Sequence, residues 1–162
     1  MRGLVIVLLA LLALLVGCGG AADIHAGIGR GALGLQVRAE PMIRQWRRDA
    51  MTGEADRVHG AGGTRKQAEA AVAAMSRRWQ CAIEGHRIFG SAVSAYVDAV
   101  YLENVTGGDF DISMMLRFLR PVLDAYRAVA ACISSLGEFE LPVPDFMDLI
   151  PPAWGLGGGD DG

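Results

Sequence analysis

Hydrophobic residues recur every three or four positions between Thr64 and about residue 104, which is the spacing of one face of an α-helix. Thr64 and Gln67 have the types and spacing of a capping box, so we predict that the helix begins there and continues without interruption. The predicted core face comprises Val72, Met75, Trp79, Ala82, His86, Phe89, Val93, Tyr96 and Val100.

A second stretch has the same period and lies between an aspartate cap and a glycine stop. Asp109 or Asp111 would cap its first turn, and Gly137 would follow its last residue, near Leu136. Its core face comprises Ile112, Met115, Leu119, Val122, Tyr126, Val129, Ile133 and Leu136. A weaker pattern predicts a shorter helix that begins at Pro41 and continues to about Val58.

The two long helices are joined by a short turn that contains glycine, so we expect them to pack antiparallel. Cys81 and Cys132 lie equally far from the centre of that turn, and this places them at the same height of the hairpin. A disulfide needs such proximity, and it would close a loop of about 50 residues, worth about 4 kcal/mol. Two buried free thiols are the alternative. By the same count, Gly90 should face Leu123.

An apolar run, Leu4 to Val16, follows Arg2 and ends in Gly17-Cys18, which is the pattern of an export signal. Residues 15–18 resemble the lipobox of bacterial lipoproteins. The resemblance implies that residues 1–17 are removed, that Cys18 carries a diacylglyceryl group, and that the protein is membrane-anchored in an oxidising compartment. Gly19, where an Asp often signals inner-membrane retention in that family, favours the outer membrane. An ordinary secretory signal and an uncleaved anchor are the alternatives.

Gly and Ala dominate the residues that follow, so we predict a flexible tether over residues 18–34 and a helical domain over residues 35–140. Residues 141–162 form a tail rich in Pro and Gly, which we expect to be disordered from residue 155. Its apolar residues would either fold back on the bundle or bind a partner. The predicted fold is therefore all-α: a three-helix bundle with a long antiparallel hairpin, a flexible N-terminal tether and an irregular C-terminal tail.

Charge is divided along the chain. Residues 1–90 carry twelve Lys or Arg against seven Asp or Glu, whereas residues 91–162 carry three against eleven. The basic half lies nearer the anchor in sequence, where anionic headgroups could attract it, although solvated helix faces would give the same division. No run of like charge is long enough to indicate a nucleic-acid-binding surface.

His86 is the candidate polar site because it interrupts an apolar stripe, with Gly85 and Gly90 close by. A core histidine that bonds to a neighbour, a metal ligand, a titratable switch and a ligand groove are the alternatives. His25 and His59 have no motif around them. Motifs for hydrolases, phosphate-binding loops and redox dithiols are missing, so we predict no catalytic residues, no cofactor and no metal.

The sequence thus favours a lipid-anchored protein of the cell envelope that faces the periplasm and has a structural or protein-interaction role. Its layout is similar to that of small helical lipoproteins of bacterial and prophage genomes, which implies envelope lysis or superinfection exclusion as forms of that role. The alternative is a periplasmic module that binds a small ligand or metal in the bundle core. The expected partners are the membrane, through the lipid, and an envelope protein.

Overall fold

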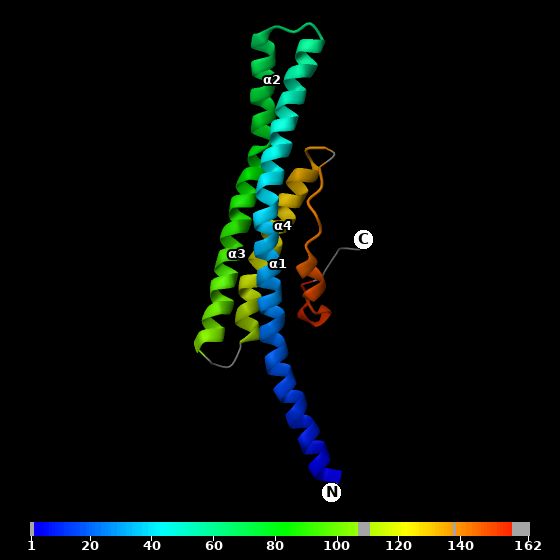
Figure 1. Cartoon of the computed structure of the whole chain (residues 1–162), viewed down its shortest axis with the longest axis vertical. Coiled ribbons are helices and arrows are strands. Elements are labelled where there is room, and N and C mark those ends of the chain that lie inside the picture. The colour runs from blue at the N-terminus through cyan, green and yellow to red at the C-terminus, as the bar shows by residue number, and fades with distance from the viewer. Residues whose placement is uncertain (1, 107–110, 138, 157–162) are drawn as a thin grey trace.

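The computed structural model describes residues 2–106, 111–137 and 139–156, with side chains from residue 20 onward. The described elements are α1 (Arg2–Gly60), α2 (Arg65–Arg78), α3 (Gln80–Thr106), α4 (Ile112–Ser134) and the short 3-10 helices η1 (Asp145–Leu149) and η2 (Pro152–Trp154). The molecule is elongated: α1 follows its long axis, α2 and α3 return alongside α1, and α4 runs back beside α3 (Figure 1). The predicted all-α fold is confirmed, and the described part of the chain contains no strand.

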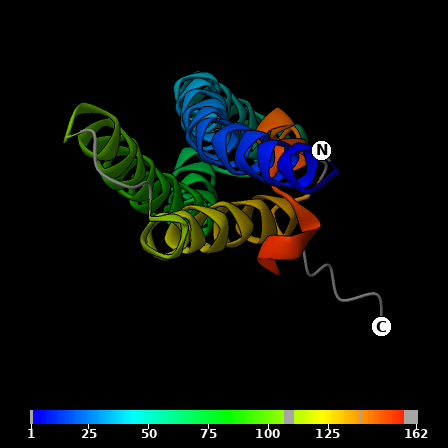
Figure 2. The same cartoon turned by 90° about the horizontal axis from the view of Figure 1, so that it is seen from below.

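Helices α1, α3 and α4 enclose one hydrophobic core (Figure 2). The two stripes predicted from the sequence supply the walls that α3 and α4 contribute, as the pattern requires. The core members from these helices are Ala82, Phe89, Val93, Tyr96, Val100, Met115, Leu119, Val122, Leu123, Ala125, Val129 and Ile133. The expected three-helix bundle is therefore present, with α1 as the third helix.

The prediction of one uninterrupted helix from Thr64 to about residue 104 is wrong at a single residue. Trp79 separates α2 from α3, although its N–H still bonds to the carbonyl of Met75 and its own carbonyl accepts from the N–H of Ile83. The two helices therefore continue nearly in line (Figure 1). Trp79 is completely buried and meets Phe139 edge to face, so packing fixes its position at the break.

The segment that we predicted to be a flexible tether is helical, because it belongs to α1. From residue 20 it supplies a buried stripe at helical spacing: His25, Ile28, Ala32, Leu35, Ala39 and Ile43. Its glycines permit close packing. A Cβ on Gly31 would lie 2.8 Å from the Cβ of Phe146, and one on Gly27 would lie 3.1 Å from Leu149. The first helix does not begin at Pro41, which lies exposed inside α1, and no boundary separates residues 34 and 35.

The helix caps agree with the sequence. The capping box of Thr64 and Gln67 is confirmed, with the Gln67 N–H donating to the Thr64 hydroxyl and the Thr64 N–H donating to the Gln67 amide oxygen. Asp111 caps α4 by accepting from the N–H groups of Ser113 and Met114, while Asp109 lies outside the described residues. Gly137 follows the end of α4 with φ +130°, which favours glycine.

The α3–α4 hairpin brings Cys81 and Cys132 to disulfide-bonding distance, with their Cα atoms 6.2 Å apart. Gly85 lies against Val129 on α4, where a Cβ would come within 2.9 Å of its side chain. Gly90 does not face Leu123 as expected. It faces Gln36 of α1, because equal distance from a turn fixes the height of a residue but not the side of the helix on which it lies.

The C-terminal segment folds back along the bundle between α1 and α4 (Figures 1 and 2). Phe146 and Leu156 are buried, and two side chains of α4 bond to the segment: the Tyr126 hydroxyl donates to the Pro142 carbonyl, and Arg127 donates to that of Leu156. Of the two alternatives for this tail, folding back on the bundle is confirmed for residues 139–156. The prediction of disorder holds for neither Gly155 nor Leu156, and residues 157–162 lie outside the described residues.

Candidate functional site

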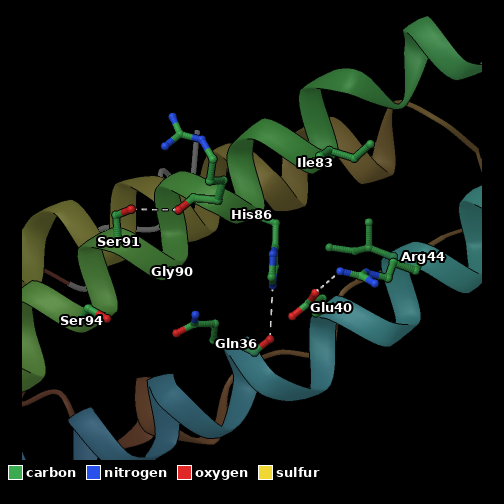
Figure 3. Close-up of a pocket in the computed structure, with 10 residues that line it drawn as sticks. Gln36, Glu40, Arg44, Ile83, His86, Gly90, Ser91 and Ser94 are labelled. Atoms are coloured by element: carbon green, nitrogen blue, oxygen red, sulfur yellow. Dashed lines mark hydrogen bonds and ion pairs between the residues drawn. The ribbon is translucent and has the colours of Figure 1, made fainter.

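An open cleft of about 720 Å³ lies between α1 and α3 and contains the predicted polar site (Figure 3). Successive turns of α1 supply one wall, and successive turns of α3 supply the other. The lining residues are Gln36, Glu40, Ile43, Arg44, Ile83, His86, Arg87, Gly90, Ser91 and Ser94.

His86 is half-buried at the edge of the core, and its ring reaches across the cleft to α1 (Figure 3). Its Nε2 lies 3.2 Å from the carbonyl oxygen of Gln36, so the histidine makes a hydrogen bond between the two helices. Gly90 lines the cleft beside it, and the space of its missing side chain is taken by the Gln36 amide. Gly85 lies elsewhere, against Val129. Two of the three predicted residues are thus together, and His86 bonds to a neighbour as one alternative predicted, but it lies at the edge of the core and not within it.

The charges of the cleft are paired within single helices. Arg44 pairs with Glu40, and Arg87 pairs with Glu84, which lowers the pKa of the Glu84 carboxyl. These exposed pairs contribute little stability. The Ser91 hydroxyl donates to the Arg87 carbonyl, whereas the buried Oε1 of Gln36 has no hydrogen-bond partner within the described protein. The cleft therefore offers polar contacts, and its described residues include no bonded nucleophile–base pair.

A second polar cluster, around His25, was not predicted. The His25 side chain is completely buried, its Nδ1 lies 2.6 Å from the hydroxyl of Tyr96, and its ring stacks on Trp154 with centroids 4.7 Å apart. Burial lowers the pKa of His25 from 6.5 to about 4 and raises that of Tyr96. The cluster ties α1, α3 and the C-terminal segment together, with His25 in its neutral form.

The signal that could have found His25 is its place in the α1 stripe. Ile28, Ala32, Leu35, Ala39 and Ile43 continue from it at spacings of three and four. The pattern was missed because glycines lie between these positions. Glycine lowers the stability of a helix unless a neighbour packs closely against it.

A third surface lies at the far end of the molecule, where α1 and α2 form a hairpin beyond the rest of the bundle (Figure 1). The hairpin carries an open groove of about 450 Å³. It is lined by Arg47, Met51, Ala55, His59, Arg65, Ala68, Glu69, Val72, Ala73 and Ser76. Most of the basic residues of the N-terminal half are therefore remote from residue 20.

In the described ranges, no three His, Cys, Asp or Glu residues are grouped so that they could hold a metal ion. From residue 20 onward, where side chains are described, no helix is sufficiently long and apolar to cross a membrane. Comparison with known proteins finds no matching family model, no similar curated protein and no similar solved structure.

Proposed function

We propose that this chain is a lipid-anchored protein of the cell envelope that presents a helical surface to another envelope protein and catalyses no reaction. Cys18 carries the lipid in this proposal, and the outer membrane is the favoured location. Superinfection exclusion and envelope lysis are specific forms of the role, and both would use such a presented surface.

The observation that carries the proposal is the continuity of α1 from the lipobox cysteine to Gly60. At 1.5 Å per residue, the 42 residues after Cys18 span about 60 Å, so the tip of the α1–α2 hairpin would stand about that far from the anchor. One acyl chain binds a membrane only marginally, but a diacylglyceryl group holds it stably. A protein built in this way can hold a docking surface at a fixed distance from a membrane.

The anchor is tested by mass spectrometry of the chain extracted from membranes. We expect a polypeptide that begins at Cys18 and carries a diacylglyceryl group, together with incorporation of labelled palmitate. The Cys18→Ala variant should be neither processed there nor labelled. An unmodified N-terminus, or cleavage at another residue, would contradict the proposal.

A second candidate is a small-ligand module that uses the cleft between α1 and α3, and the unsatisfied Oε1 of Gln36 favours it. A polar ligand with a donor group would satisfy that oxygen, and Ser94 and His86 could add contacts. Native mass spectrometry of the full chain purified from cells tests this. A bound small molecule that disappears in the Ser94→Trp variant supports the module, and a spectrum of the unliganded chain opposes it.

A further inference from the structure

The α1–α2 hairpin has little packing of its own. Helix α2 packs mainly against α1, and Ala68 is its one fully buried residue. Met75 and Ala50 are partly buried, and Trp46 is partly buried against Phe139 of the C-terminal segment, while Ala73 is exposed. A pair of helices can enclose only one side of each apolar face, so a third helix would complete the packing.

The groove of the hairpin has the form that a helix requires. Met51 and Ala55 follow Arg47 at intervals of four residues along α1, which makes one straight wall. Val72 and Ser76 belong to the facing wall on α2. The walls are held together by a hydrogen bond of 3.0 Å from Arg47 to the Ser76 hydroxyl. The floor is apolar, and four of the ten lining residues are alanine or serine, so a helix could approach closely at those positions.

Arg47 is the cationic side chain of the groove that could bind a charged partner. Its guanidinium is half-buried in the wall, and its Nε is buried without a hydrogen-bond partner among the described residues. No carboxylate of the described chain pairs with it, unlike Arg57 and Arg65, which pair with Glu54 and Glu69. A partly desolvated guanidinium without a carboxylate partner is a site for an incoming carboxylate, which would bind its accessible N–H donors by charge-assisted hydrogen bonds.

The wider hairpin has the same sign of charge. Residues 44–78 carry eight Lys or Arg against four Asp or Glu, a net charge of +4. The exposed Arg48, Lys66, Arg77 and Arg78 have no ion pair in the part of the chain that is described. Such a field attracts acidic partners and speeds their association.

We propose that the α1–α2 groove binds an acidic amphipathic helix of a partner protein, with its apolar stripe on Met51, Ala55 and Val72 and a carboxylate on Arg47. The inference rests on the interaction role proposed above and names its surface and partner class. A second copy of the chain is disfavoured, because a two-fold contact of the hairpins would bring two surfaces of charge +4 together. A flat anionic membrane would pair with the cations but leave the apolar floor uncovered.

Binding is tested with the full chain in phosphatidylcholine nanodiscs and two 18-residue helical peptides, measured by fluorescence anisotropy. Both peptides carry the same Leu and Ala stripe, flanked by Glu in one and by Lys in the other. We expect the Glu peptide to bind at least tenfold more tightly, and less tightly as salt is raised. Equal binding of the two peptides, or no binding of the Glu peptide, would overturn the proposal.

The surface is assigned with matched variants of neighbouring alanines on α2. Ala73 lines the groove and Ala74 does not, although both are exposed. Ala73→Glu should weaken binding of the Glu peptide at least tenfold, and Ala74→Glu should change it less than twofold. Arg47→Gln should also weaken it about tenfold, the effect of losing one charge-assisted hydrogen bond of roughly 1.5 kcal/mol. Equal effects of Ala73→Glu and Ala74→Glu would place binding elsewhere.

Crosslinking in cells separates failure of this surface from failure of the interaction role. A photoreactive residue is placed at Ala73, Ala74 or, in the cleft, Ser94. Crosslinks from Ala73 to a partner's acidic helical segment, identified by mass spectrometry, support the proposal. Crosslinks to protein from Ser94 alone would refute binding at the α1–α2 groove but would agree with the interaction role. The absence of protein crosslinks at all three positions would refute both the groove and the interaction role. Crosslinks from Ala73 to lipid alone would assign the hairpin to a membrane surface.

Discussion

Acidification should destabilise the fold through His25. The pKa of this histidine is lowered from 6.5 to about 4 by burial, so the unfolded chain binds a proton between those pH values that the folded chain excludes. Above about pH 6.5 the histidine is neutral in both states and has no effect. The free energy of unfolding should therefore fall as the pH drops from 6.5 towards 4. The loss is about 2 kcal/mol at pH 5 and approaches roughly 3 kcal/mol below pH 4.

The measurement is urea unfolding of the full chain in detergent, followed by circular dichroism at pH 7.5, 6 and 5. Other groups of the chain also contribute to the pH dependence of stability, so the informative quantity is a difference between variants. His25→Gln keeps a polar side chain that stays neutral, and it should lose about 2 kcal/mol less than the parent chain between pH 7.5 and pH 5.

Two results would refute this reasoning. The first is an equal loss of stability in the parent chain and in His25→Gln over the same range. The second is a histidine resonance for His25, observed by NMR in the folded chain, that titrates near pH 6.5. Since Trp154 stacks on the His25 ring, a change in its fluorescence that follows the loss of stability would show that the C-terminal segment opens with protonation.

Further predictions concern the disulfide, the packing of the tail and a helix cap. Replacing both Cys81 and Cys132 by Ser should lower the free energy of urea unfolding by about 4 kcal/mol, because the bridge spans 51 residues; an unchanged midpoint would contradict this. Gly31→Ala should release the C-terminal segment from α1, seen as protease cleavage near Phe146, whereas Gly53→Ala, which meets nothing within 4 Å, should stabilise α1 by up to about 1 kcal/mol. Asp111→Ala should cost about 1 kcal/mol in thermal unfolding, and Asp111→Asn should cost little, because both Asp and Asn accept from the same N–H groups.

The α3–α4 hairpin could be predicted in detail because its signals are local and repeated. The stripes are long, and the caps have side chains that bond to the backbone. Because the turn is short, the position of each residue along the hairpin axis can be counted from it. Residue numbers alone therefore place Cys81 and Cys132 at the same height. Counting could not give the rotation of each helix about its axis. For this reason Gly90 was assigned to Leu123 and not to Gln36.

The N-terminal part of α1 could not be predicted because the same glycines are compatible with two opposite structures. In an isolated segment, Gly27, Gly29 and Gly31 favour flexibility. In this fold Gly27 and Gly31 admit Leu149 and Phe146 to close contact with the helix backbone, and that contact offsets their helix cost. The partners lie more than 60 residues away in the chain. The His25 cluster was missed for the same reason, because the residues that contact His25, Tyr96 and Trp154, are distant from it in the chain.

In the lipid-anchored protein proposed above, the continuity of α1 would make the length of the chain between Cys18 and the hairpin a functional quantity. A domain on a flexible tether samples many positions and orientations, which lowers the effective concentration of its binding surface at any one place. A helix that is joined directly to the bundle acts as a spacer of set length, and it also sets the direction in which the groove points. Each residue inserted directly after Cys18, before the buried stripe of α1 begins, would raise the whole bundle by about 1.5 Å and turn it by about 100° relative to the anchor. Height and orientation are thus coupled, so seven inserted residues would nearly preserve the facing of the groove, whereas two would turn it away from a partner that is itself held in place.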